Sequence, residues 1–142
     1  MENILEKVAQ LLQTDSRIEA AYLFGSRAKA AKSQSPRSDT DIALFLKQSS
    51  VPKSLDIAIE WSLKLERLIS GPVDVVILNT ADPFLRFQVY HAGTPLFERD
   101  PKQSRDFEIR SLYEYWDFLP IQRMIEENSI ERLKNDYGQR PS

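Results

Sequence analysis

Three short apolar segments of this chain each adjoin polar residues that an ordinary buried strand would not carry. They are 20–24 before Gly25-Ser26, 42–46 after Asp39-Thr40-Asp41, and 73–78 around Asp74. Short apolar runs bounded by turn residues are typical of buried strands. Side chains two residues apart on a strand point to the same face, so Asp39 and Asp41 should lie together. The chain is thereby restricted to folds in which a small sheet gathers carboxylates at one place.

These carboxylates have the chemistry of a magnesium site. Two carboxylates held close together repel each other unless a cation lies between them. Mg²⁺ takes oxygen ligands and is commonly held by one or two carboxylates together with substrate phosphates. Asp74 stands in a valine-rich run, where a buried charge is costly unless it is paired or bound to a metal. If its strand lies beside that of Asp41, three carboxylates converge, enough for a two-metal site of phosphoryl transfer.

The segment between the first two strands has the features of a phosphate site. Gly25 allows a close backbone approach to a phosphate. Ser26 stands at the start of a short helix predicted for 26–31, where free N–H groups favour anions. The segment 27–38 has no acidic residue and four basic ones, Arg27, Lys29, Lys32 and Arg37. Positive charge beside an acidic metal site suits a triphosphate.

Helical periodicity accounts for most of the remaining chain. Helices are predicted at 3–13, between Pro52 and Gly71, at 82–93, and at 102–119 and 121–135, the last two separated or kinked at Pro120. The second of these helices has an apolar stripe at Leu55, Ile59, Ser62, Leu65 and Ile69. A short extended piece is predicted at 95–98. The order of helices and strands predicts an α/β or α+β fold, with a small mixed β-sheet flanked by helices.

Composition excludes several classes of site. With 142 residues, the chain suits one domain. It has no cysteine and one histidine, which excludes disulfides, cysteine nucleophiles and multi-histidine metal sites. The net charge of -2 argues against nucleic-acid binding over the whole surface. No apolar run is long enough for a membrane span, and the N-terminus lacks signal-peptide features, so a cytoplasmic protein is expected.

Two of these motifs resemble a known family. Residues 25–29 together with 38–44 resemble the signature of the DNA polymerase β-type nucleotidyltransferase superfamily, and 23–28 resemble its minimal nucleotidyltransferases, the MNT proteins. Residues 73–76 match the place of the family's third carboxylate, and 89–97 resemble the family's ending. The resemblance covers about 5–100. Twelve residues separate Ser26 from Asp39, slightly more than usual, and Lys29-Ala30 replaces the commoner Arg-Gly.

The resemblance implies a nucleotidyltransferase fold, with a core at 1–100 and a C-terminal helical extension of the same domain at 101–142. Many MNT proteins are antitoxins that transfer AMP from ATP to a tyrosine of a HEPN ribonuclease toxin. By this resemblance Asp39 and Asp41 bind Mg²⁺, and Asp74 completes the metal site and acts as or assists the base. Gly25 and Ser26 hold the triphosphate, and Arg27 is a secondary phosphate contact. The implied partner is the cognate toxin, in a hetero-oligomer, with no direct binding of nucleic acid or membrane.

Several alternatives stay open. The chain could be a non-catalytic antitoxin that masks its toxin through the C-terminal helices, or a nucleotidyltransferase acting on a small molecule. Arg86 and His91 have the spacing of the HEPN nuclease motif itself, although that fold is all-helical and this chain has strand patterns. The C-terminal region also concentrates aromatic residues that either cover the sheet or form a partner surface. They are Phe107, Tyr113, Tyr115, Trp116 and Phe118.

Overall fold

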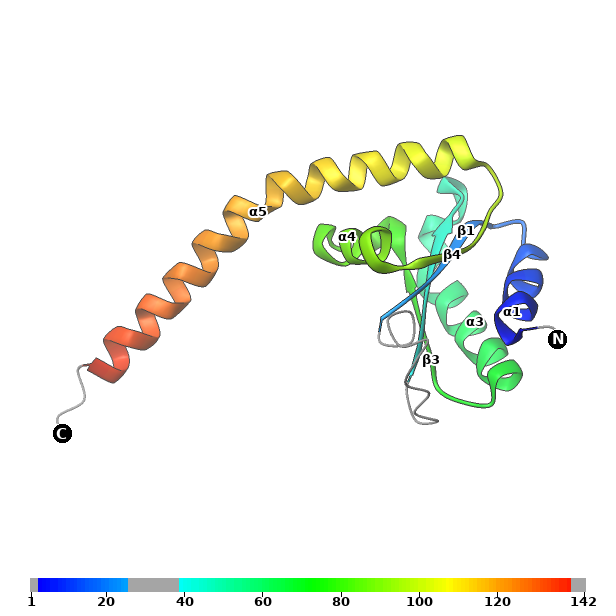
Figure 1. Cartoon of the computed structure of the whole chain (residues 1–142), viewed down its shortest axis with the longest axis horizontal. Coiled ribbons are helices and arrows are strands. Elements are labelled where there is room, and N and C mark those ends of the chain that lie inside the picture. Colours follow the sequence, from blue (N-terminus) through cyan, green and yellow to red (C-terminus); the bar gives the residue numbers. More distant parts are fainter. Residues whose placement is uncertain (1–2, 26–38, 139–142) are drawn as a thin grey trace.

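A four-stranded mixed sheet lies between two layers of helices in the computed structural model, which describes residues 3–25 and 39–138 (Figure 1). The strands are β1 (Ile18–Phe24), β2 (Thr40–Leu46), β3 (Val73–Ile77) and β4 (Thr94–Glu98). Their order in the sheet is β3-β2-β1-β4. Strand β1 pairs antiparallel with β2 and β4, whereas β2 pairs parallel with β3. This confirms the predicted mixed sheet flanked by helices.

The helices cover both faces of this sheet. They are α1 (Ile4–Gln13), α3 (Ser54–Ile69), α4 (Pro83–Ala92) and α5 (Pro101–Gly138), with 3₁₀ turns η1 (Gln48–Lys53) and η2 (Leu78–Thr80). Side chains of β1 and β2 alternate between two buried clusters. Helices α1 and α3 pack on one cluster, and α4 and the start of α5 pack on the other. Because both faces are covered, the strands read as nearly continuous apolar runs.

The face of α3 that packs on the sheet is not the predicted stripe. Ile57, Trp61 and Leu65 are buried, whereas Leu55 and Ile59 are 74% and 51% exposed. Of the predicted stripe, only Leu65 is fully buried. Helix α3 has more apolar residues than one face can bury. The face that is buried carries Trp61, because the indole N–H finds a hydrogen-bond partner there, as buried tryptophans usually require.

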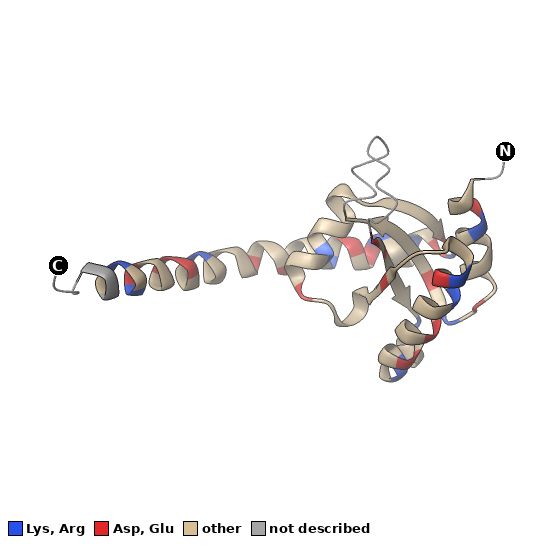
Figure 2. Ribbon diagram, turned by 90° about the horizontal axis from the view of Figure 1, so that it is seen from below, with Lys and Arg blue, Asp and Glu red and all other residues tan. Residues whose placement is uncertain are grey.

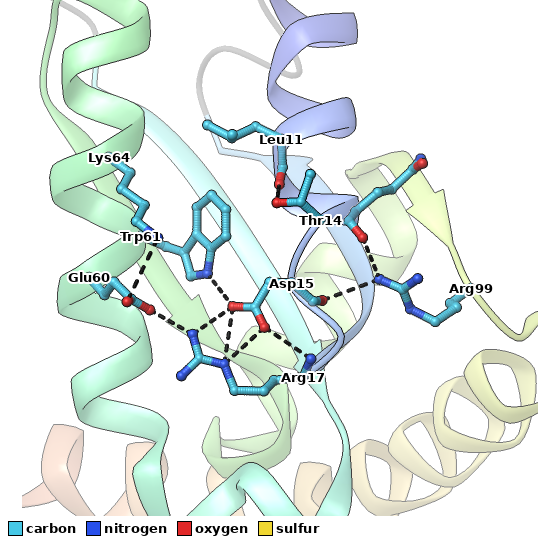
Figure 3. Close-up of polar contacts among 9 residues, drawn as sticks. Leu11, Thr14, Asp15, Arg17, Glu60, Trp61, Lys64 and Arg99 are labelled. Atoms are coloured by element: carbon cyan, nitrogen blue, oxygen red, sulfur yellow. Dashed lines mark hydrogen bonds and ion pairs between the residues drawn. The ribbon is translucent and has the colours of Figure 1, made fainter.

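That partner is Asp15, which lies in the segment between α1 and β1 (Figure 3). The Asp15 carboxylate accepts hydrogen bonds from Trp61 Nε1 at 2.8 Å and from the Arg17 guanidinium at 2.6–3.1 Å. Arg17 also bonds Glu60 of α3 at 2.6 Å. The hydrogen bonds from Arg17 hold the pKa of the Asp15 carboxyl well below its usual range, against the opposing effect of burial. The segment between α1 and β1 is thereby tied to α3.

We expect Asp15→Asn to lower the free energy of unfolding by about 1–3 kcal/mol near neutral pH, because charged hydrogen bonds to a mostly buried group are lost. A carboxyl whose pKa is lower in the folded state stabilises the fold above its unfolded pKa of about 4 and loses this effect as the pH falls further. Urea unfolding at pH 7 and pH 3 measures the difference. The exposed Asp117 on α5 supplies the control, Asp117→Asn. An equal loss at both pH values would contradict the prediction.

Helix α5 is a single helix of 38 residues with Pro120 inside it. Separation into two helices is therefore wrong, whereas the predicted alternative of a kinked helix agrees with the bend of α5 along its length (Figure 1). Its start packs on the domain through Ser104, Phe107 and Ser111, which are buried. Beyond Pro120 the helix projects away from the sheet (Figure 1) and carries charges of both signs (Figure 2). Although α5 is long, no helix in the described ranges has an apolar stretch able to cross a membrane.

The aromatic residues of α5 divide between the two alternatives left open by the sequence. Phe107 stacks on Phe45 with ring centroids 4.5 Å apart, and Tyr115 stacks on Phe87 of α4 at 4.1 Å. Tyr113 and Trp116 instead contact each other and are 61% and 56% exposed. One side of α5 therefore covers the domain, and the other presents aromatic rings to solvent.

Candidate functional site

Strand pairing brings Asp41 and Asp74 side by side. Asp41 is the second residue of β2 and lies directly opposite Asp74 in the parallel pairing of β2 with β3. Asp39 immediately precedes β2, and alternation along the chain places its side chain on the same face as that of Asp41. The sequence predicted that the strand of Asp74 could lie beside that of Asp41, and the sheet has this arrangement.

Gly25 lies against the Asp41 carboxylate at the end of β1. Phe24, the last residue of β1, pairs with Asp41, and Gly25 follows with a φ of 80°. A side chain is strained at this backbone angle. A Cβ atom at Gly25 would also collide with Oδ2 of Asp41. Glycine is therefore required twice at this position, for its conformation and for the space beside the carboxylate.

The three carboxylates repel one another. Burial raises the pKa of the Asp41 carboxyl above its usual range, and the negative charges of Asp74 and Asp39 raise it further. Asp74 itself is exposed, so the expectation that it is buried is wrong. The reason is the strand order, which makes β3 an edge strand of the sheet. Within the described ranges, no ion pair involves these three carboxylates.

The fit of a divalent cation rests on the chemistry of these ligands. Carboxylate oxygens are the ligands that Mg²⁺ prefers, and a cation would relieve the repulsion that raises the pKa of Asp41. In the parts of the chain that the structure describes, however, no three acidic, histidine or cysteine side chains are arranged as a metal site. The described residues thus supply suitable donors without an assembled coordination shell.

The predicted phosphate contacts are only partly described. Gly25 is placed beside Asp41. Ser26, Arg27, the short helix predicted at 26–31 and the other basic residues of 27–38 lie outside the described residues. The roles of Ser26 and Arg27 therefore stay predictions from the sequence.

A pocket of about 550 Å³ beside Gly25 was missed by the sequence reasoning. Its walls are Phe24 and Gly25 from the end of β1 and five residues of α4, namely Phe84, Phe87, Gln88, His91 and Ala92. The α4 residues recur at helical spacing on one side of the helix. This periodicity is visible in the sequence and could have indicated the pocket, but not what lies opposite it.

Arg86 and His91 do not form a nuclease pair. Arg86 is buried on the side of α4 that faces α5, where it pairs with Glu114 and donates a hydrogen bond to Ser111. His91 is exposed on another side of α4 and stacks on Phe87, with ring centroids 5.2 Å apart. The two side chains thus lie in different surroundings and do not form one site. The mixed sheet also differs from the all-helical fold of HEPN nucleases.

Comparison with known proteins relates this arrangement to nucleotidyltransferases. The family model described as polymerase beta, nucleotidyltransferase matches residues 6–102. No curated protein matches the chain significantly.

Solved structures of similar fold include three toxin–antitoxin structures. A toxin–antitoxin structure with AMP-PNP has a TM-score of 0.70 at 21% identity, covering 91% of this chain and 99% of that one. A tri-AMPylated Shewanella oneidensis HEPN toxin in complex with MNT antitoxin gives 0.68 at 21% identity, covering 89% and 96%. The toxin–antitoxin MntA-HepT gives 0.68 at 21% identity, covering 89% and 97%. At this identity the likeness concerns the fold.

Proposed function

The chain belongs to the polymerase beta nucleotidyltransferase family, and from this we propose that it is an antitoxin that transfers AMP from ATP to a tyrosine of a HEPN-family toxin. The observation that carries the proposal is the meeting of Gly25, Asp41 and Asp74 at one end of the sheet. A tightly placed glycine beside repelling carboxylates is poorly suited to fold stability alone and well suited to a cation and a phosphate chain. Because a ribonuclease target would act in the cytoplasm, we propose the same location for this chain.

The proposed reaction joins the tyrosine oxygen to the α-phosphorus of ATP. The bond from that phosphorus to the β-phosphate bridging oxygen breaks, and pyrophosphate leaves. Asp39, Asp41 and Asp74 would hold Mg²⁺, which when bound supplies positive charge to the triphosphate. Asp74 is exposed, so its carboxylate is accessible to accept the proton of the tyrosine hydroxyl. The backbone at Gly25 and Ser26 would hold the triphosphate, with Arg27 as a further contact.

The exposed side of α5 supports a protein partner. Four apolar residues lie there, each at least 46% exposed, and we call them the outer stripe: Ile109, Tyr113, Trp116 and Met124. By helical geometry this stripe is opposite to the buried Phe107 and Ser111. Exposed aromatic and methionine side chains in a contiguous row are typical of interaction surfaces. Solved structures of similar fold are complexes of MNT antitoxin with HEPN toxin.

The same stripe favours a second candidate function, neutralisation by masking alone. In that case the chain would bind the toxin through α5, and the carboxylates would be dispensable. The two functions differ in one observable, which is whether the toxin stays inhibited when the carboxylates are removed.

The deciding experiment mixes the purified chain with α-labelled ATP, Mg²⁺ and the protein encoded by the neighbouring gene. We expect label on that protein, and none with the double variant Asp39→Ala/Asp41→Ala. A variant of two exposed acidic residues on α1 and α3, Glu6→Ala/Asp56→Ala, controls for lost negative charge. If the double variant binds the partner and still blocks its toxicity, with no label transferred by the wild type, masking replaces catalysis.

A further inference from the structure

The aromatic pocket adjoins the carboxylate site. Its walls include Phe24 and Gly25, of which Phe24 pairs with Asp41 in the sheet and Gly25 touches the Asp41 carboxylate. A molecule whose phosphates lie beside Asp41 would therefore meet the pocket with its other end. The volume of about 550 Å³ falls within the range of small-molecule sites.

The pocket wall formed by α4 is aromatic, and two of its rings, Phe84 and Phe87, also pack on Tyr115 of α5. The core side of α4 is provided by Arg86 and Val89, which are buried. Phe84 and His91 are exposed on the pocket side. The rings of Phe87 and His91 are nearly parallel, at 10° and 5.2 Å. Tyr115 lies parallel to Phe87 as well, at 7° and 4.1 Å, so α4 and α5 together hold a column of parallel rings beside the pocket.

We propose that this pocket holds the nucleobase of the bound nucleotide and gives the chain a preference for adenine. The proposal rests on the nucleotide transfer proposed above. Every base has a flat π-face, and stacking on aromatic side chains is a common way to hold one. With the base against α4, the triphosphate extends past Gly25 toward Asp41, and the two parts of one nucleotide fill two adjoining sites.

Gln88 supplies the preference among bases. It is exposed, lines the pocket, and its side-chain amide makes no hydrogen bond within residues 3–25 and 39–138. A glutamine amide offers a donor and an acceptor together, which matches N7 and N6 of adenine. Guanine presents two acceptors on that edge, which arginine or lysine usually bind. The described lining of the pocket contains neither of these residues.

Direct binding tests the proposal independently of transfer. The affinities of ATP, GTP and inorganic tripolyphosphate are measured by calorimetry with Mg²⁺, for the wild type, Phe84→Ala and Gln88→Ala. Loss of one stacking partner should weaken ATP binding about 5- to 140-fold and leave tripolyphosphate binding unchanged. Gln88→Ala should bring the ATP and GTP affinities together. Leu55→Ala, an exposed apolar residue on α3, is the control.

The outcomes separate this proposal from the proposed function. If Phe84→Ala weakens ATP binding and Gln88→Ala removes the difference between ATP and GTP, the pocket is supported even if no label reaches the partner protein. Wild-type ATP affinity in both variants overturns the base site, and if these variants also lose transfer, the pocket receives the acceptor instead. Equal affinity of the wild type for ATP and tripolyphosphate overturns the proposal as well, because the base then contributes nothing.

Discussion

Replacing Asp41 with asparagine should abolish nucleotidyl transfer while making the folded chain more stable. Burial and the charges of Asp74 and Asp39 raise the pKa of this carboxyl. A group whose pKa is higher in the folded state destabilises the fold at pH values above that pKa, and the cost disappears as the pH falls through it. Asparagine removes the charge with little change of shape. We expect a gain of about 1 kcal/mol, the order of one like-charge contact in water.

Activity should fall by about 100- to 1,000-fold or more, the usual cost of removing one electrostatic stabiliser of a transition state. Transfer of labelled AMP and urea unfolding measure the two effects on the same preparations. Mg²⁺ should stabilise the wild type and have a smaller effect on Asp41→Asn. Asp56→Asn, exposed on α3, is the control and should change neither quantity. A less stable Asp41→Asn, or one that transfers AMP at the wild-type rate, would contradict the assignment of Asp41 to a cation.

The double substitution Tyr113→Ser/Trp116→Ser should separate the chain from its partner protein without unfolding it. The two rings contact each other at 5.7 Å and are mostly exposed, so the free energy of unfolding should change by no more than about 0.5 kcal/mol. Aromatic residues at the centre of an interface commonly contribute about 2 kcal/mol or more each, which is roughly 30-fold in affinity. The loss for the pair should therefore be several hundred-fold.

Calorimetric titration of the partner into each variant measures this loss. The control is Leu55→Ser/Ile59→Ser, an exposed apolar pair on α3 that packs on the opposite face of the sheet. It should bind as the wild type does. ATP affinity should be the same in all three proteins. If the outer-stripe variant keeps full affinity, the partner binds elsewhere and α5 has another purpose.

Local patterns in the sequence were sufficient for most of the secondary structure. The apolar runs became β1, β2 and β3. The helix predicted at 82–93 became α4, which Asp82 caps by accepting a hydrogen bond from the Leu85 amide at 2.8 Å. The juxtaposition of Asp41 and Asp74 followed from one assumption about which strands are neighbours. These features depend on residues close together in the chain or on a single strand pairing.

The features that the sequence did not predict depend on residues far apart. The buried face of α3 is fixed by Trp61, whose indole partner, Asp15, is 46 positions away. The exposure of Asp74 follows from the place of β3 at the edge of the sheet. Helix α5 continues past Pro120 as one element, and the sequence alone did not decide between this and two separate helices. The pocket needs α4 opposite the end of β1, which no local pattern specifies.

The stacking of Tyr115 on Phe87 has a thermodynamic consequence. One face of Phe87 belongs to the junction of α4 and α5, and the residue also lines the pocket beside Gly25. Any ligand of α5 that alters how this helix sits on α4 will change the affinity of the pocket for its own ligand. Linkage then requires that occupancy of the pocket change the affinity of α5 by the same factor. The partner surface of α5 and the pocket would then be coupled, and the coupling can be measured from either site.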